Sequence, residues 1–338
     1  NKLKTMLAQR HLAIIRHYAI INRTLTTSKS IIKIKEDVQD AILNGKPVVA
    51  LESTIIAHGF PYPENLQVAK EAERILRSKN VVPATIAVKD GSCRIGLTEE
   101  ELEDLAKSGK AGRARKCSTR DLPIILGVHE NSNETRWGAT TVASTMKLAH
   151  LAGISTFVTG GIGGVHRDGH VTMDVSADLT ELSRTPVVVV SAGIKSILDI
   201  KRTLEVLETN SVPTLGWKTD EFPAFFSPYS GVKCPTRVES AKDVASIYWS
   251  ARDLNMPQGM VVAVPNDDPA GANIEKAIQD ALKEAKELDI NGQDVTPFIL
   301  KYVAEHTGGE SLRSNAALVK HNVTIGADIA VAIASINR

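Results

Sequence analysis

The sequence predicts a single α/β domain, a three-layer α/β/α sandwich with a large, mostly parallel sheet. Two observations support this prediction. Segments with strand character alternate with segments of helical spacing along the chain, which is typical of α/β folds. No internal repeat and no linker interrupts the middle of the chain, and its 338 residues with 43% hydrophobic content can fill one large core.

The predicted strands are short apolar runs bounded by glycine, proline or polar turn residues. Several are apolar throughout, as expected for strands that are buried on both faces of a parallel sheet. The expected strands cover residues 47–51, 83–88, 93–95, 122–128, 154–158, 187–190, 214–217 and 259–264.

The predicted helices carry apolar residues at the spacing of one helix face. The sequence Thr-Glu-Glu-Glu at 98–101 is a capping box, so we expect it to open a helix that ends at Gly109. The apolar C-terminal end of the chain is also expected to be helical. The other expected helices cover residues 34–44, 65–79, 138–152, 196–208, 239–254, 274–288, 296–306 and 312–321.

Lys195 lies just after the apolar strand 187–190, where open α/β sheets keep their ligands. A lysine in a desolvated site near other cations can form a Schiff base with a carbonyl carbon. The alternative is an exposed lysine in the first turn of the following helix. Residue type and position leave both readings open at this point.

Glu52 also follows a strand, and the basic segment 113–120 (RARKCSTR) follows a helix. A carboxyl group at such a position can act as a general acid or base if burial raises its pKa. It can equally cap or pair locally. The four cations of the basic segment indicate either a phosphate site or a solvated basic loop.

A glycine-rich loop follows the strand 154–158, with glycines at 160, 161, 163 and 164. Such a loop can expose several N–H groups to a phosphate, and His166 and Arg167 add further donors. Asp174 and Asp178 supply hard oxygen atoms that suit a divalent cation or a sugar hydroxyl. With Glu52, the basic segment 113–120 and Lys195, this loop is expected to lie at one edge of the sheet.

Composition excludes some classes of protein. The net charge of +1 gives no electrostatic reason to expect a nucleic-acid partner. No apolar run approaches the length expected of a membrane span. The three scattered cysteines (Cys93, Cys117 and Cys234) lack the spacing of a metal site, and their odd number favours a reducing compartment.

Residues 1–33 differ from the rest of the chain, because they contain basic residues, serines and threonines but no acidic residue. This composition predicts a transit peptide, mitochondrial by preference. The alternative is a disordered basic leader, in which case we expect a cytoplasmic or peroxisomal protein. The folded domain is expected to cover residues 34–338.

Several long motifs occur in the order known from one family: ALESTIIAHGFPYPEN, PATIAVKDG, TTVASTM, TGGIGGVHR, DVSADL, SAGIKSILD, PAFF, TPF and SNAALV. From about residue 38 to the C-terminus the chain resembles the pseudouridine-5′-phosphate glycosidases, also called the indigoidine synthase A-like family. The resemblance implies a three-layer fold with a mixed sheet and a homotrimer. It also implies manganese or another divalent metal, without an organic cofactor.

The implied reaction is the reversible cleavage of pseudouridine 5′-phosphate to uracil and ribose 5-phosphate. The family's proton donor matches Glu52, its Schiff-base nucleophile Lys195 and its metal ligand Asp174. In some relatives the domain is fused to a sugar kinase, so a functional link to a pseudouridine kinase is expected. Implied substrate contacts match Lys116, Val142, Ser176, Ala177 and Asp178, and phosphate or ribose contacts match Thr159, His166 and Asn315.

One departure from the family pattern is the polar connector 129–137 (HENSNETRW), where relatives have a few small residues. It is expected to alter the rim of the site and to leave the catalytic motifs intact. Three other functions are weighed against the resemblance. They are a dinucleotide-dependent oxidoreductase, which the glycine spacing disfavours, a Schiff-base lyase acting on another sugar phosphate, and a non-catalytic scaffold.

Overall fold

The computed structural model describes residues 31–128, 136–271, 273–290 and 295–336. Within these residues an 11-stranded sheet runs through the molecule in the order β1-β4-β3-β2-β7-β9-β13-β11-β12, with β6 and β5 branching from β3. The strands are β1 (Ile32–Ile34), β2 (Val48–Leu51), β3 (Val82–Lys89), β4 (Ser92–Ile95), β5 (Ala114–Cys117), β6 (Trp137–Thr140), β7 (Thr156–Val158), β9 (Val188–Ser191), β11 (Thr214–Trp217), β12 (Thr236–Val238) and β13 (Met260–Ala263).

Most neighbouring strands are parallel, and β3 pairs antiparallel with β4 and β6. The sheet is therefore mixed and mostly parallel, as predicted. A separate small sheet joins β8 (Val165–His166) to β10 (Leu198–Asp199) in antiparallel fashion.

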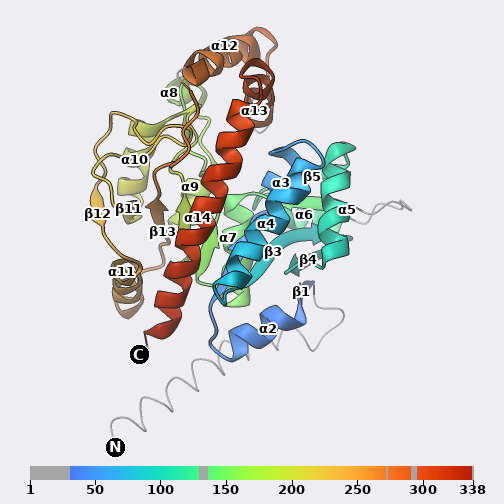
Figure 1. The fold of residues 1–338 in the computed structure, drawn as a ribbon, viewed down its shortest axis with the longest axis vertical. Coiled ribbons are helices and arrows are strands. Elements are labelled where there is room, and N and C mark those ends of the chain that lie inside the picture. The colour runs from blue at the N-terminus through green and yellow to red at the C-terminus, as the bar shows by residue number, and fades with distance from the viewer. Residues whose placement is uncertain (1–30, 129–135, 272, 291–294, 337–338) are drawn as a thin grey trace, which may run out of the picture.

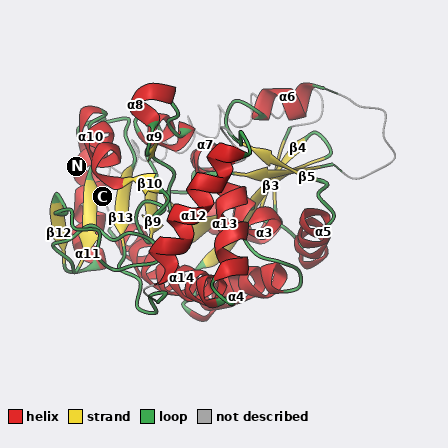
Figure 2. Cartoon of the chain, turned by 90° about the horizontal axis from the view of Figure 1, so that it is seen from above, coloured by secondary structure: helices red, strands yellow, loops and turns green. Residues whose placement is uncertain are grey.

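Helices lie on both faces of the large sheet (Figures 1 and 2). One face carries α4, α11 and α14, and the other carries α7 and α9, which gives the predicted three layers. The described helices are α2 (Glu36–Leu43), α3 (Thr54–His58), α4 (Glu64–Ser78), α5 (Glu99–Lys110), α6 (Leu122–Gly127), α7 (Val142–Ala152), α8 (Gly169–Thr172), α9 (Ala177–Leu182), α10 (Ile200–Thr209), α11 (Ala241–Asp253), α12 (Asn273–Glu287), α13 (Val295–His306) and α14 (Glu310–Ser335).

The register of three central strands determines where the polar residues after them lie. Leu51 of β2 pairs with Val158 of β7, and Val158 pairs with Val190 of β9. Because the three strands are parallel, the residues that follow them emerge at the same edge of the sheet. Glu52 and Thr159 are thus neighbours, although more than a hundred residues separate them in the chain.

Helix α14 is, among the described residues, long and apolar enough to cross a membrane by length and composition, with 56% of its most apolar window buried. The expectation that no stretch approaches that length is therefore wrong. The helix packs on β2, β7 and β9 and on α4 and α11. Its buried Asn322 donates to the carbonyl oxygen of Thr159 (2.9 Å), so its apolar side belongs to the core of the domain.

Residues 122–127 form helix α6 and not the predicted strand. A short apolar run does not distinguish a buried strand from a short helix. Pro123 lies in the first turn of α6, where a missing N–H costs nothing, whereas in a central strand it would remove a ladder hydrogen bond. Pro123 therefore favours the helix over the strand for residues 122–127.

The predicted helix 138–152 begins later than expected, because its first residues form β6. Helix α7 starts at Val142, after the backbone N–H of Thr141 donates to Oγ of Ser144 (2.9 Å). Trp137, which we assigned to the polar connector, is buried in β6, and its Nε1 donates to Asp104 (3.0 Å). Residues 129–135 of that connector lie outside the described residues.

Three other element boundaries differ from the predictions. The segment predicted as helix 196–208 begins with β10, and α10 starts at Ile200, where Asp199 accepts from the N–H of Arg202 (2.9 Å). The helix predicted at 312–321 and the helical chain end form one continuous helix, α14. Strand β1 includes residues 32 and 33, which we placed in the leader, and residues 1–30 lie outside the described residues.

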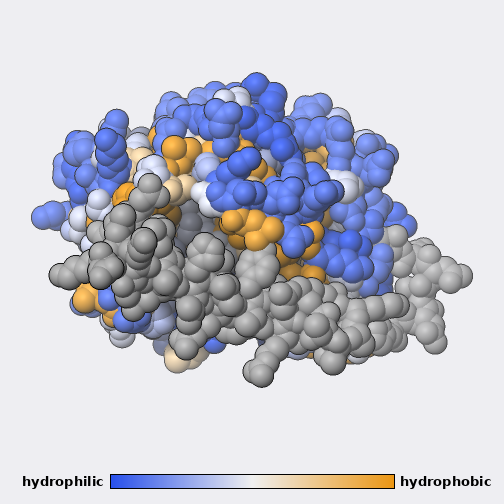
Figure 3. All heavy atoms as spheres, turned by 90° about the horizontal axis from the view of Figure 1, so that it is seen from below, coloured by the Kyte–Doolittle hydropathy of each residue, from blue (hydrophilic) through white to orange (hydrophobic). Residues whose placement is uncertain are grey.

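The side of the molecule that carries α2 and the C-terminal end of α14 is shown in Figure 3. Polar residues predominate on the described part of this surface, and apolar residues form small patches between them.

Candidate active site

A cavity of about 380 Å³ lies at the carboxyl ends of the parallel strands. Its volume falls in the range of sites that bind small molecules. Every residue that the family resemblance assigned to the site lines this one cavity. They are Glu52, Lys116, Val142, Thr159, His166, Asp174, Ser176, Ala177, Asp178, Lys195 and Asn315. Arg167, the further donor expected at the glycine loop, does not line the cavity and donates to the carbonyl oxygen of Ser196 (2.8 Å).

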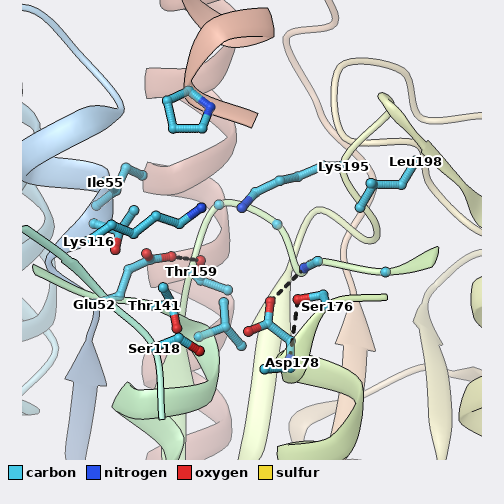
Figure 4. Close-up of a pocket in the computed structure, with 18 of the residues that line it drawn as sticks. Glu52, Ile55, Lys116, Ser118, Thr141, Thr159, Ser176, Asp178, Lys195 and Leu198 are labelled. Atoms are coloured by element: carbon cyan, nitrogen blue, oxygen red, sulfur yellow. Dashed lines mark hydrogen bonds between the residues drawn. The ribbon is translucent and has the colours of Figure 1, made fainter. Parts of the chain in front are cut away.

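Glu52 lies at the base of the cavity, 7% exposed, directly after β2. Hydroxyl groups of the next two residues fix this turn to β6. Oγ of Ser53 accepts from the N–H of Thr140 (2.7 Å), and Oγ1 of Thr54 donates to the carbonyl oxygen of Thr140 (2.9 Å). The glutamate side chain accepts a hydrogen bond from the Thr159 hydroxyl (Figure 4).

Burial raises the pKa of the Glu52 carboxyl group above its usual range, because desolvation disfavours the charged form. The positive charge of Lys195 and the Thr159 hydrogen bond oppose this effect, and the negative charge of Asp178 adds to it. The net result is a carboxyl group that keeps its proton to higher pH than a free glutamate. Glu52 is therefore suited to donate a proton.

Lys195 lies in the loop between β9 and β10, where its N–H donates to the carbonyl oxygen of Ile162 (3.2 Å). This excludes the alternative of a lysine in the first turn of a helix. Gly193 permits the turn, since its φ is +83° and a Cβ there would lie 2.2 Å from the carbonyl oxygen of Pro223. Figure 4 shows the side chains of Lys195 and Lys116 extending from opposite sides toward the space above Glu52.

The basic segment contains strand β5 and is not a loop throughout. Lys116 and Arg120 reach the cavity, whereas Arg115 donates to the buried carboxylate of Asp121 (3.1 Å). Asp121 also accepts from the N–H of Ser118 (3.0 Å) and so shapes the turn after the strand. The sequence left two interpretations of this segment, a phosphate site and a solvated basic loop. Lys116 forms part of a cationic wall of the cavity, which agrees with the first, and the segment contains a strand, which does not agree with the second.

The glycine loop is closely packed and does not present all its N–H groups to the cavity. A Cβ at Gly161 would lie 2.6 Å from the Phe225 ring, and one at Gly164 would lie 2.4 Å from Oγ1 of Thr203. These glycines are thus required by packing. Five N–H groups donate within the protein, those of Thr159, Ile162, Gly163, Val165 and His166. At these positions the expected phosphate cradle is not found.

We expect Gly163→Ala to destabilise the protein by about 1–3 kcal/mol and to lower kcat. The added Cβ would lie 2.3 Å from Oγ of Ser176 and 2.7 Å from Oδ2 of Asp178, so the loop or α9 must shift. Thermal unfolding and steady-state kinetics measure the two effects. Gly127→Ala is the matched control, because a Cβ there meets no atom within 4 Å. Equal stability of the two variants would contradict the prediction.

His166 and Asp174 lie together at the cavity wall, with Nδ1 of the imidazole 3.6 Å from Oδ2 of the carboxylate. Burial lowers the pKa of His166, and the Asp174 charge only partly opposes this, so the ring favours its neutral form. In the part of the chain that the structure describes, no group of three or more His, Cys, Asp or Glu side chains could hold a metal. Asp174 and His166 form one pair of such donors at the cavity wall.

Helices α13 and α14 complete the cavity from the other side. Asn315 of α14 lines it, and its buried Oδ1 accepts no hydrogen bond from the described residues, so this atom can accept one from a ligand. Sequence reasoning did not single out several other lining residues. Most of them lie inside segments it had marked: Ile55 and His58 in ALESTIIAHGFPYPEN, Arg120 in the basic segment, Phe225 in PAFF and Pro297 in TPF, whereas Leu300 lies outside the motifs.

Comparison with protein families gives a match between residues 37–332 and the family described as indigoidine synthase A like protein. A curated relative from Arabidopsis thaliana, named pseudouridine-5′-phosphate glycosidase, is 50% identical over 311 residues, which cover 91% of this chain and 92% of the relative. A relative of the same name from Petrotoga mobilis is 49% identical over 302 residues, covering 88% and 96%.

Two solved structures share the fold. The prealnumycin C-glycosynthase AlnA, solved in complex with ribulose 5-phosphate, superposes with a TM-score of 0.81 at 32% identity and covers 91% of this chain and 98% of its own. An indigoidine synthase A-like protein from Thermotoga maritima superposes with a TM-score of 0.78 at 38% identity, covering 90% and 96%.

Proposed function

This chain belongs to the indigoidine synthase A-like family, and from that premise we propose that it is a pseudouridine-5′-phosphate glycosidase. It would cleave the carbon–carbon bond between uracil and ribose 5-phosphate reversibly, as a step of pseudouridine and nucleotide catabolism. The observation that carries the proposal is one cavity in which a buried, proton-retaining Glu52 lies below two lysines. The names of the relatives at about half identity agree with it.

Ordinary glycosidases cleave a bond to oxygen with a pair of carboxyl groups. Here the leaving atom is carbon, so the enzyme must first make the bond to it weaker. Nζ of Lys195 would bond to C1′ of the ribose while the bond from C1′ to the ring oxygen breaks. The oxygen takes up a proton, and the sugar is then an open chain attached to the lysine.

The lone pair on the lysine nitrogen would next form a C1′=N double bond as the bond from C1′ to C5 of uracil breaks. The proton on Glu52 is transferred to C5, and uracil leaves. Water then hydrolyses the imine, which restores the lysine and releases ribose 5-phosphate. One water is consumed, and no oxidant or reductant is needed.

Binding of the 5′-phosphate would use the cationic wall. Lys116 lines the cavity, and the sequence resemblance assigns it to the substrate. His166, Thr159 and Asn315 also line the cavity and would contact the phosphate or the ribose. The other implied substrate contacts line the cavity where two helices begin: Val142 at the start of α7, and Ser176 and Ala177 at the start of α9. Holding the substrate in this way supplies orientation at the reacting carbon.

The residues at the cavity fit a divalent cation that keeps most of its water. Ions such as Mg²⁺ are bound by one or two carboxylates plus water and substrate oxygens, and Mn²⁺ has similar ligand preferences. Asp174 offers one carboxylate of this kind, with His166 beside it. When bound, the ion would polarise an oxygen of the substrate or of water.

We expect Asp174→Asn to weaken Mn²⁺ binding by at least about tenfold, because the amide oxygen is a weaker ligand than a carboxylate. Calorimetric titration with Mn²⁺ alone measures the affinity, and the kinetics measure activity after chelation and metal replacement. Asp168→Asn is the control, since Asp168 is exposed and outside the cavity. Identical Mn²⁺ affinities of the two variants would remove Asp174 as the ligand.

The proposed activity is tested by incubating the protein with pseudouridine 5′-phosphate and Mn²⁺ and following uracil release, with borohydride added to a parallel sample. Uracil release together with a reduced adduct on Lys195 would support the reaction and its nucleophile. An adduct with ribose 5-phosphate but no uracil release would instead point to a Schiff-base lyase with another leaving group. Absence of both would reject the proposal.

Three further expectations stay predictions, the first two implied by the resemblance and the third by the composition of residues 1–33. They are the homotrimer, which light scattering would test, the functional link to a pseudouridine kinase, and the mitochondrial targeting by residues 1–33.

A further inference from the structure

The carboxylate of Asp178 is held in place by hydrogen bonds from the protein backbone. It lies at the start of α9 and is 5% exposed. Its Oδ1 accepts a hydrogen bond from the N–H of Ala143 (2.9 Å), and its Oδ2 accepts one from the N–H of Gly163 (2.8 Å). Both carboxylate oxygens are therefore engaged before any substrate is present, and a dashed line at the Asp178 carboxylate in Figure 4 marks the bond from the glycine loop.

The two donors belong to different walls of the cavity. Ala143 lies in the first turn of α7, next to Val142, and Gly163 lies in the glycine loop after β7. The carboxylate thus joins three segments, α9, α7 and the glycine loop, that no local sequence signal brings together. Removal of Asp178 would leave two buried N–H groups without their acceptor.

The glycine loop is pressed against Asp178 so tightly that only glycine fits. A Cβ at Gly163 would lie 2.7 Å from Oδ2 of Asp178. Backbone and carboxylate are therefore in direct contact, with no space for a substrate group between them. The hydrogen bond fixes the loop at the point where it passes the cavity.

Asp178 also occupies the N-terminus of α7. A helix N-terminus attracts anions, because its first N–H groups are unpaired and its dipole is positive there. Here the protein supplies that anion itself. The N–H of Ala143 is consequently not available to the phosphate of a substrate, which leaves the phosphate to the cationic wall.

We infer that Asp178 is a positioning residue, whose carboxylate fixes the glycine loop against the N-terminus of α7. This role goes beyond the substrate contact implied for it by the sequence resemblance. The same negative charge contributes to raising the pKa of Glu52, so Asp178 also helps to keep the proton donor protonated.

The inference can be tested with Asp178→Asn, which keeps one acceptor oxygen and turns an amide N–H₂ toward the second donor. In substrate-free protein we expect amide hydrogen exchange to rise about tenfold in peptides that contain residues 141–145 and 160–165. With pseudouridine 5′-phosphate we expect kcat to fall about 10²-fold, because the reacting groups are misplaced, while KM changes much less.

Glu181→Gln is the matched control. Glu181 is also a buried carboxylate on α9, but it accepts hydrogen bonds from Arg184 and Thr185 and does not line the cavity. It should leave exchange in the two cavity peptides and kcat unchanged. Unchanged exchange in Asp178→Asn together with a raised KM would overturn the inference in favour of a substrate contact.

The unmodified protein provides a measurement that does not depend on the folding of a variant. If Asp178 positions the loop, both peptides are protected from hydrogen exchange without ligand. Ribose 5-phosphate should then add little further protection at the N–H groups of Ala143 and Gly163. Protection that appears only with ribose 5-phosphate would overturn the inference. The kinetic readout rests on the proposed function, whereas exchange in ligand-free protein does not, so the failure of one is distinguishable from the failure of the other.

Discussion

Lys195→Ala is expected to abolish turnover of pseudouridine 5′-phosphate, with a fall in kcat of at least about 10⁴-fold. The reaction as proposed has no route to the open-chain sugar without a nitrogen that can form the C1′=N bond. Borohydride in the presence of ribose 5-phosphate should label the unmodified protein at Lys195 and leave the variant unlabelled. Mass spectrometry of the intact protein and of its peptides measures both.

Two further variants distinguish the role of Lys195 as a nucleophile from the role of its positive charge. Lys195→Arg keeps a cation near Glu52 but forms no imine, so we expect it to be as inactive as the alanine variant. Lys201→Ala removes an exposed lysine from the first turn of α10 and should behave like the unmodified protein. Turnover at a normal rate in Lys195→Arg would show that the lysine acts through its charge, and the Schiff-base mechanism would then be wrong.

Glu52→Gln is expected to lower kcat by about 10²–10⁴-fold, the usual contribution of a positioned general acid. The amide keeps the shape of the side chain and can still accept from the Thr159 hydroxyl, but it has no proton to give to C5 of uracil. Glu73→Gln is the matched control, because Glu73 is a partly buried carboxyl group whose pKa is likewise raised by desolvation, but it accepts from the Thr85 hydroxyl and lies outside the cavity.

The pH dependence of the unmodified enzyme follows from the direction of the Glu52 shift. The acid form is the active form, and burial raises the pKa of this group. We therefore expect kcat to be retained as pH rises past the ordinary range of a glutamate, and to fall only as pH passes through the raised pKa. This alkaline limb should be absent from the residual activity of Glu52→Gln.

Thr159→Val provides a second check on the same group. The Thr159 hydrogen bond lowers the pKa of Glu52, so its removal should move the alkaline limb to higher pH. Thr159→Ser, which keeps the hydroxyl, should leave the limb in place. A limb that stays in place in the valine variant, or in Glu52→Gln, belongs to another group, and Glu52 would then not be the proton donor.

Several features of this protein could be predicted from local sequence. The alternation of apolar runs and helical segments gave the fold class, and the capping box at Thr98 correctly marked the start of α5. Glu52 and Lys195 could be placed after strands because apolar runs ended beside them. These predictions succeeded since each depends on residues that are near one another in the chain. Where a short apolar run fits two elements, as at 122–127, local sequence was insufficient until the role of Pro123 was known from the structure.

The composition of the site depended on contacts that no local pattern contains. The pairing of Leu51 with Val158 brings Thr159 to Glu52, and the antiparallel pairing of β3 with β6, which carries β5 beside it, brings Lys116 to the same cavity. The sequence showed a glycine-rich loop suited to a phosphate, but the structure shows that five N–H groups of this segment, only one of them from a glycine, are already bonded within the protein. Residue types fix which hydrogen bonds a segment can make, whereas only the packing of distant segments decides which of those bonds are left for a substrate.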